Sequence, residues 1–261
     1  MSYKSVIFEK DEHIATITFN RPKKLNTFTE EFFHEINDVL DAVIADRDMR
    51  VLIVTGGNKV FSAGDQLGNP GGDLTGTRWG EHMAGLFHST MQKLTKLPIP
   101  VIAAIAGYAL GGGCEFALAC DIRIGTIDSQ YGLPEIQVGV IPIGGGTVRL
   151  PHLVGPGWAK YLIFTGERID AQKALQIGLI THLVPNEDLM AEAGKVAEKL
   201  AKLPPIQLKL CKISINNSLN VGIDAGLLFE ERMVPMLAGL EDVEEGIAAF
   251  LQKREPVYKG R

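Results

Sequence analysis

Cysteine and histidine are scarce in this chain of 261 residues. The three cysteines form no Cys-x-x-Cys pair and are odd in number, so a disulfide framework is not expected and a reducing, cytoplasm-like compartment is favoured. The histidines show no metal-ligand spacing. We therefore expect no metal site.

Long apolar runs and an excess of positive charge are missing too. The longest apolar stretch, residues 101–110, is too short to span a bilayer, and residues 1–12 contain no signal-peptide core. We therefore expect a soluble, cytoplasmic protein with no membrane partner. The net charge of −5 argues against a nucleic-acid partner. A polyanionic ligand would have to be bound by a few placed cations.

The apolar residues that are present alternate between strand and helix patterns. Residues 14–19 alternate as a half-buried strand does, and Thr27 with Glu30 predicts a capping box at the start of a helix. Apolar residues recur in that helix at Phe32, Ile36, Val39, Leu40 and Val43. Short apolar runs predict further strands at residues 51–55, 101–106, 122–125 and 179–184. This alternation predicts an α/β core.

The C-terminal part of the chain has only helical patterns. Asn186 predicts a helix N-cap, and Pro204-Pro205 separates one helix from the next. We therefore divide the chain into an α/β core, residues 1–200, and a helical segment, residues 201–261. The helical segment has more apolar residues than a thin appendage can bury alone: Leu227, Phe229, Met233, Met236 and Phe250. Packing on the core or formation of an oligomer would cover them.

A glycine-rich stretch runs from residue 67 to residue 85. A loop of this length is typical of a lid or a pocket wall, and an ordinary surface loop fits the same pattern. Trp79, Met83 and Phe87 follow at helical spacing. They are candidates for the wall of a pocket, or simply for core packing.

The segment 106–117 places a glycine cluster between a buried strand and a helical pattern. Glycines let a ligand approach the backbone, and the free N–H groups of a first helical turn stabilise developing negative charge. This place is therefore a candidate oxyanion hole. Close packing of helix on sheet is the alternative. Neither a Walker loop nor a dinucleotide fingerprint is present, because no Gly-Lys-Ser/Thr and no Gly-x-Gly-x-x-Gly with a later acid follows.

Two glutamates lie in apolar surroundings close to this turn. Glu115 falls in the first turn of the predicted helix, and Glu135 follows Pro134 after a further twenty residues, since 135 − 115 = 20. Each one alone fits a structural role, at a helix N-terminus or in a buried ion pair. Together, beside a candidate oxyanion hole, they indicate an acid/base pair. Cys114 has no evident histidine partner and is interpreted as a small core residue.

Several motifs, in this order along the chain, resemble the enoyl-CoA hydratase/isomerase (crotonase) family. They are Asn20-Arg21-Pro22, Phe61-Ser62-Ala63-Gly64, the run from Gly107 to Glu115, Asp121-Ile122-Arg123, Pro134-Glu135-Ile136, Ile141-Pro142 through Thr147, Arg149-Leu150, Thr165-Gly166, Gly178-Leu179 and the ending from Phe250 to Pro256. The resemblance covers nearly the whole chain.

This resemblance implies a spiral core of repeated β-β-α units with a C-terminal helical trimerisation segment, assembled as a homotrimer or a dimer of trimers. It also implies an acyl-CoA substrate. Coenzyme A is then part of the substrate, and no separate cofactor is expected. The thioester oxygen would be bound by the backbone N–H groups of Asp65 and Gly112.

The resemblance also implies roles for side chains. Glu115 would activate the water that attacks Cβ, and Glu135 would deliver a proton to Cα. Hydratases of the family carry both glutamates, as this chain does. Substrate-binding positions carried over from the family are Lys23, Lys24, Leu25, Ala63, Gln66, Leu67, Tyr108, Phe250 and Lys253. The two lysines also fit a solvated, charged turn.

The chain departs from the family pattern at Asp65. The family usually has a small or apolar residue after Ala-Gly and an acid one position later, whereas this chain has Asp65-Gln66. A carboxylate of Asp65 close to the thioester oxygen would oppose the charge to be stabilised. The leading hypothesis is an enoyl-CoA hydratase. The alternatives are a Δ3-Δ2-enoyl-CoA isomerase, a hydratase of cyclic or dienoyl groups, and a scaffold or RNA-binding protein that retains the fold.

Overall fold

The computed structural model describes residues 3–66 and 77–261, with only the backbone described at residues 77–79. The main sheet has the strand order β1-β2-β3-β4-β6-β9. Its strands are β1 (Val6–Asp11), β2 (Ile14–Phe19), β3 (Val51–Thr55), β4 (Val101–Ile105), β6 (Ile122–Thr126) and β9 (His182–Val184). β1 and β2 form an antiparallel hairpin, and all the other pairs are parallel. A small second sheet contains β5 (Tyr108–Leu110), β7 (Gln130–Gly132) and β8 (Ile169–Asp170).

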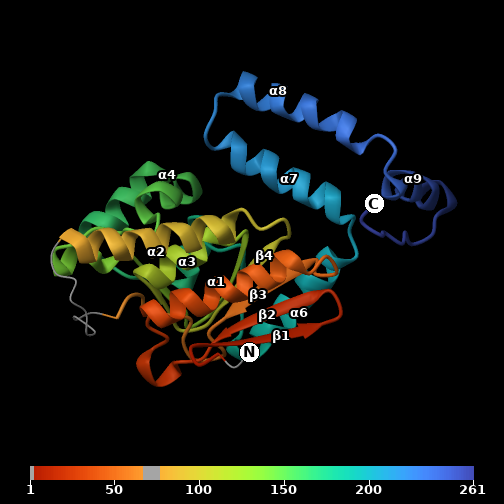
Figure 1. Ribbon diagram of the computed structural model, residues 1–261. Helices are drawn as coiled ribbons and strands as arrows, with labels where there is room; N and C mark the ends of the chain where they lie inside the picture. Colours follow the sequence, from red (N-terminus) through yellow and green to blue (C-terminus); the bar gives the residue numbers. More distant parts are fainter. Residues whose placement is uncertain (1–2, 67–76) are drawn as a thin grey trace.

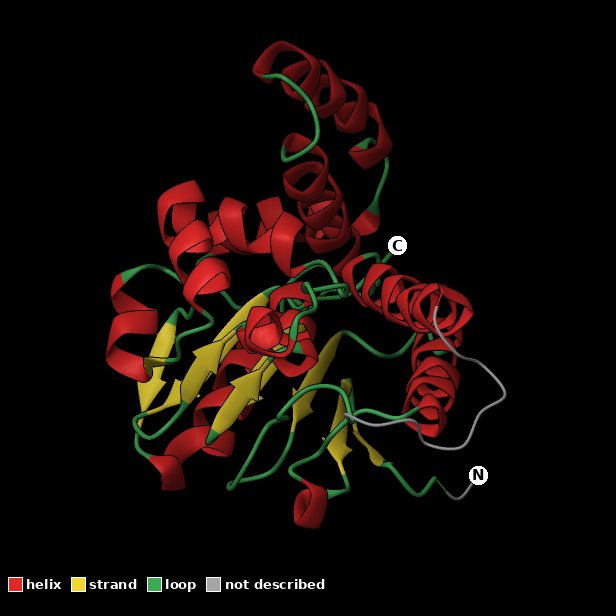
Figure 2. Ribbon diagram, turned by 90° about the vertical axis from the view of Figure 1, so that its left-hand side faces the viewer, coloured by secondary structure: helices red, strands yellow, loops and turns green. Residues whose placement is uncertain are grey.

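Helices cover both faces of the main sheet (Figures 1 and 2). The α-helices are α1 (Glu30–Ala45), α2 (Thr77–Thr95), α3 (Gly112–Ala119), α4 (Gly146–Thr165), α5 (Ala171–Gln176), α6 (Leu189–Ala201), α7 (Pro205–Ser218), α8 (Ile223–Met233) and α9 (Glu241–Gln252). Short 3₁₀ turns lie at η1 (Pro22–Lys24), η2 (Pro134–Val138), η3 (Asn186–Asp188) and η4 (Val234–Leu237). α4 is interrupted at Gly155, where φ is +76°.

The two faces of the sheet bury different sets of side chains. Leu52 and Val54 of β3 join the larger core with helices α1, α2 and α3, whereas Val51 and Ile53 pack against α6. This division follows from the alternation of side chains along a strand. Burial on both faces explains why β3 and β4 are continuous apolar runs.

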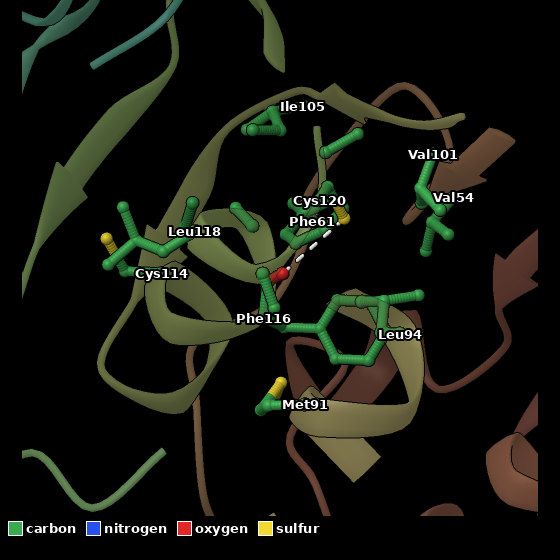
Figure 3. Packing of buried hydrophobic residues seen from close by; sticks show 14 of the residues in the cluster. Val54, Phe61, Met91, Leu94, Val101, Ile105, Cys114, Phe116, Leu118 and Cys120 are labelled. Atoms are coloured by element: carbon green, nitrogen blue, oxygen red, sulfur yellow. Dashed lines mark hydrogen bonds between the residues drawn. The ribbon is translucent and has the colours of Figure 1, made fainter. Parts of the chain in front are cut away.

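α3 is the central helix of the larger core, and all eight of its residues are buried. Phe116 on α3 lies among Met91 and Leu94 of α2, as Figure 3 shows, and its ring meets Phe19 edge to face at 5.3 Å. A helix that is apolar on every side is stable only inside a protein. The core therefore fixes the position of the helix that carries Glu115.

The predicted strand at residues 14–19, the helix with its apolar face and the buried strand at 51–55 are confirmed. The predicted capping box is wrong. Thr29 is the N-cap of α1, and its side chain accepts from the N–H of Phe32. Thr27 lies in the preceding turn, where its carbonyl accepts from Arg21. Phe28 then pairs with Asp65 in an extended bridge, which delays the helix.

Two other boundaries also differ from prediction. The strand at 179–184 contains only His182–Val184, because Leu179 and Ile180 are buried in the turn that follows α5. Asn186 begins η3 and donates to Asp128, whereas Asp188 is the residue that precedes α6.

Helices α7–α9 stand off the body of the molecule (Figure 1). Lys212 of α7 anchors them to the core through an ion pair with Asp121 at 2.7 Å. Arg50 donates to the carbonyls of Ala201 and Tyr258, which ties the C-terminal tail to β3. A domain division near residue 200 stays a prediction. No helix in the described part of the chain is long and apolar enough to cross a membrane.

Candidate active site

The predicted oxyanion donors lie where two glycine-containing segments meet. Gly64 has a φ of +92°, and a Cβ there would lie 2.9 Å from the amide nitrogen of Gly112. Gly112 is the first residue of α3, so its N–H has no intrahelical acceptor. The N–H of Phe28 donates to Gly64 O, and the N–H of Gln66 donates to Phe28 O, so the Asp65 N–H between them points away from Phe28. Both N–H groups are therefore suited to bind a ligand oxygen.

A buried polar network holds the Gly64–Asp65 segment. Ser62 Oγ donates to Asn26 O at 2.8 Å and accepts from the Gly64 N–H at 3.0 Å. The Asn26 amide in turn donates to Val60 O at 2.8 Å. Ser62 and Asn26 are both buried, and buried polar groups bonded in this way define one backbone arrangement.

Glu115 is nearly inaccessible, with 1% of its surface exposed. Its Oε1 accepts two hydrogen bonds, from the N–H of Gly144 at 2.7 Å and from that of Gly146 at 2.8 Å. Burial raises the pKa of Glu115 to about 7, while these N–H groups and the charge of Arg149 act in the opposite direction. Oε2 takes part in neither of these two bonds. The two bonds to Oε1 orient the Glu115 carboxyl group, and its raised pKa allows it to exchange a proton near neutral pH.

Glu135 lies in η2 and reaches the same glycine turn. Gly111, with φ +53° and ψ −129°, adopts a conformation that only glycine tolerates well, and a Cβ there would lie 3.5 Å from Glu135 Oε1. Both carboxylate oxygens are buried and form no well-made hydrogen bond to any described residue. Burial raises the pKa of Glu135 to about 7, its own backbone N–H opposes this shift, and the charge of Glu115 adds to it. Glu135 thus lies at the turn where α3, the helix that carries Glu115, begins.

The family is decided by comparison with known proteins. Residues 9–261 match the family model described as enoyl-CoA hydratase/isomerase. A short-chain-enoyl-CoA hydratase of Clostridium acetobutylicum is 38% identical over 98% of this chain and 97% of its own. A 2,3-dehydroadipyl-CoA hydratase of Escherichia coli is 35% identical over 98% of this chain and 99% of its own. The crystal structure of an enoyl-CoA hydratase from Bacillus anthracis matches with a TM-score of 0.94, at 38% identity, and covers 98% of this chain and 100% of the other.

The chain belongs to the enoyl-CoA hydratase/isomerase family. The crotonase-like α/β fold predicted from the motifs is confirmed, because the TM-score of 0.94 extends over nearly the whole chain. It is an enzyme of this family.

Most of the substrate-binding positions carried over from the family lie near the glycine turn. Ala63 and Gln66 are half-buried and flank the Gly64–Asp65 segment. Gln66 Oε1 accepts from Arg21 Nη2 at 3.0 Å. Lys23 and Lys24, in η1, are exposed, and Leu25 follows them. Their segment is tied to the site because the Ala63 N–H donates to Leu25 O.

The remaining predicted positions are dispersed. Tyr108 on β5 is half-buried beside Arg168, whose guanidinium lies 5.5 Å from the ring centre. Leu67 lies outside the described residues. Phe250 and Lys253 are exposed at the end of α9, which stands away from α3 within one chain (Figure 1). A single copy of the chain does not bring these two residues to the glutamates.

Asp65 has a half-buried side chain at the predicted oxyanion position. Burial raises its pKa to about 6, although the carboxyl group also interacts with the N–H of Gln66, which lowers it. That interaction orients the carboxyl toward the Gln66 backbone. Near pH 6 this group therefore changes its charge on the same residue whose backbone N–H is the proposed thioester contact.

The sequence did not predict the groups that orient Glu115, and it left Trp79, Met83 and Phe87 as candidates for a pocket wall or for core packing. The N–H groups that bind the Glu115 carboxylate belong to Gly144 and Gly146, in the glycine cluster that follows Glu135. The contact between this cluster and Glu115 forms only in the folded chain. Phe87 is a core residue, with a ring 4.6 Å from Phe33, and it also packs directly on Gly112. Met83 is buried in the same core, and the side chain of Trp79 lies outside the described residues.

The unpartnered Glu135 should reduce stability at neutral pH. Its pKa is raised from 4.5 to about 7, so the folded state binds the proton more tightly than the unfolded state does, and stability falls as pH rises through this window. Glu135→Gln removes the charge and breaks no well-made hydrogen bond. We expect it to increase the free energy of unfolding at pH 8 by about 2 kcal/mol, allowing for partial exposure, and to change it little at pH 4.5.

Urea unfolding at both pH values measures this difference. Glu9→Gln, at an exposed position on β1, is the control for removing one negative charge. An equal effect of Glu135→Gln at the two pH values would contradict the assigned cause.

Proposed function

We propose that this protein is an enoyl-CoA hydratase, which adds water across the 2,3 double bond of an enoyl-CoA thioester. The observation that carries the proposal is the position of the Glu135 carboxyl at the glycine turn where α3, the helix of Glu115, begins. The N–H of Gly112 lies in this turn, against the Gly64–Asp65 segment, and the charge of Glu115 contributes to the raised pKa of Glu135. The names of the relatives support the same reaction class and an acyl-CoA substrate.

In the proposed mechanism the N–H groups of Asp65 and Gly112 bind the thioester oxygen. This polarises the conjugated system and makes Cβ electrophilic. Glu115, in its ionised form, accepts a proton from water as the water oxygen bonds to Cβ, and the electron pair moves to the thioester oxygen as an enolate. Glu135, in its protonated form, then delivers a proton to Cα. Coenzyme A remains in the substrate, and no separate cofactor takes part.

The surroundings of the two glutamates support these separate roles of base and acid. Carboxyl groups whose pKa is near 7 can serve as acid or as base at neutral pH. The two N–H donors of Gly144 and Gly146 stabilise the ionised form of Glu115. Among the residues that the structure describes, Glu135 has no such donor beyond its own backbone N–H. We therefore assign the base to Glu115 and the acid to Glu135.

Isomerisation of a Δ3 double bond, or hydration of a cyclic or dienoyl group, is the alternative. The observation that favours an unusual acyl group is Asp65, whose partly buried carboxyl is absent from the usual family pattern. Among the relatives, the enzyme named 2,3-dehydroadipyl-CoA hydratase has a substrate that itself ends in a carboxyl group.

The direct test is a panel of trans-2-enoyl-CoA thioesters with short, long and cyclic acyl groups, without added metal or nicotinamide. Hydration removes the conjugated absorbance of the thioester. We expect at least one substrate to lose it, and the rate to be unchanged by a chelator. If no member of the panel reacts, or if chelation stops turnover, the proposal fails. A Δ3-enoyl-CoA that gains conjugated absorbance instead would identify the isomerase.

We further propose a homotrimer or a dimer of trimers. The support is the set of large apolar side chains that a single copy leaves exposed on the C-terminal helices: Ile223, Leu227, Leu228, Phe250 and Leu251. Large apolar side chains exposed together on one segment are typical of an interface. We expect light scattering at micromolar concentration to give three or six times 28.3 kDa. A monomer would contradict the proposal. A cytoplasmic location stays a prediction.

A further inference from the structure

Arg149 of α4 is bonded to the turn that holds Glu115. Its Nη1 donates to Gly144 O at 2.9 Å, and Nη2 reaches Thr95 Oγ1 at 3.5 Å. The peptide on the other side of Gly144 donates to Glu115 Oε1. Arg149 therefore fixes the same residue whose N–H orients the glutamate.

The intervening Gly145 leaves room for the guanidinium. Its φ is +106°, and a Cβ at this position would collide with Arg149 Nη1. The backbone N–H of Arg149 also donates to Gly145 O at 2.7 Å. The turn at residues 144–146 is thus shaped around one arginine, and its two N–H groups are aimed at one carboxylate. A residue of another size or donor geometry would not hold all these groups together.

The charged and titratable groups around Glu115 come from several elements. Arg149 faces it from α4, Glu135 lies on η2, and Cys114 precedes it on α3. α2 contributes Phe87, which has no charge, beside Gly144. Burial raises the pKa of Glu115 and lowers the pKa of Arg149. The charge of each group acts against the effect of burial on the other.

We propose that Arg149 is a positioning residue that holds the 144–146 turn against Glu115 and keeps this carboxylate ionised and aimed for proton transfer. The inference rests on the proposed role of Glu115 as the base. Arg149 acts through the Gly144 peptide and through the field of its charge.

The test compares Arg149→Met, which is neutral, with Arg149→Lys, which keeps the charge but presents one compact donor group. Lys160→Met is the matched control, because it removes an exposed positive charge from the same helix. Two readouts are used. One is the pH dependence of kcat and KM on an enoyl-CoA. The other is the titration of the Glu115 side chain in the substrate-free protein, followed by ¹³C NMR and assigned by its loss in Glu115→Gln.

We expect the pKa of Glu115 in Arg149→Met to rise by about one unit above its value of about 7, since an opposite charge nearby has been removed. The acid limb of the pH–rate profile should move to higher pH by the same amount. With the turn released, kcat should fall about 10- to 100-fold while KM changes little. Arg149→Lys should retain the pKa and still lose kcat, because one ammonium cannot reach both Gly144 and Thr95. Lys160→Met should match the wild type.

An unchanged Glu115 titration in Arg149→Met would overturn the inference, and so would an equal rise of the pKa in Arg149→Lys. If Arg149→Met does not fold, Arg149→Lys decides, and a wild-type kcat in that variant contradicts the proposed positioning. If the wild type hydrates no substrate, the proposed function fails. The NMR titration still tests the link between Arg149 and Glu115 by itself.

Discussion

Glu115→Gln should lower kcat for hydration by about 10²–10⁴-fold, the usual contribution of a positioned acid or base. Glutamine keeps the size of the side chain and can still accept from Gly144 and Gly146, but it cannot take a proton from water. Binding of the acyl-CoA should be largely retained, because the proposed oxyanion donors are backbone groups. Exchange of the Cα protons with solvent should survive in part, since Glu135 remains. Steady-state hydration and deuterium exchange measure the two activities.

The matched control is Glu30→Gln, in the first turn of α1. It removes another carboxylate from a helix N-terminus, where the helix dipole favours negative charge, and should leave catalysis unchanged. Glu135→Gln should abolish both hydration and exchange. If Glu115→Gln hydrates at nearly the wild-type rate while Glu135→Gln is inactive, Glu115 is a structural helix-end carboxylate and the enzyme is a single-base isomerase.

Gly64→Ala should lower kcat by about 10²–10³-fold, the range observed when one oxyanion donor is removed. The added methyl would lie 2.7 Å from Leu110 O and 2.9 Å from the nitrogen of Gly112, so the two glycine segments must separate. The N–H groups of Asp65 and Gly112 would then no longer point to one oxygen. Initial rates on the best enoyl-CoA of the panel measure the loss.

Gly57→Ala separates this effect from backbone strain. Gly57 has a φ of +79°, close to the +92° of Gly64, but no described atom lies within 4 Å of the position of its Cβ. Both alanine variants should lose stability, by about 1–3 kcal/mol, because each holds a non-glycine residue at positive φ. Only Gly64→Ala should lose catalysis. Equal rates in the two variants would show that the approach of Gly64 to Gly112 is unimportant for turnover.

The local patterns of the sequence predicted the elements that surround the site. The buried strand before Gly107 and the helix that carries Glu115 follow from periodicity and from glycine placement. The predicted element boundaries were wrong where a contact between residues distant in sequence outweighs a local sequence pattern. Thr27 fits a capping box, yet its neighbour Phe28 is held in extended form by Asp65. Phe28 and Asp65 are far apart in the sequence, so the residues around Thr27 give no sign of this pairing.

The sequence by itself determined the fold class and the family, because both depend on runs of neighbouring residues, and it singled out the two glutamates as candidates. The tertiary structure decided how the glutamates differ. Glu115 has the N–H groups of Gly144 and Gly146, and Arg149 reaches the turn that contains them. The Glu135 carboxylate forms no well-made hydrogen bond to any residue in the described part of the chain. The tertiary structure also placed α9, the helix that contains Phe250, away from the body of the molecule in a single chain (Figure 1). These outcomes depend on segments that are distant in sequence and adjacent only after folding, because burial and hydrogen bonding act through space.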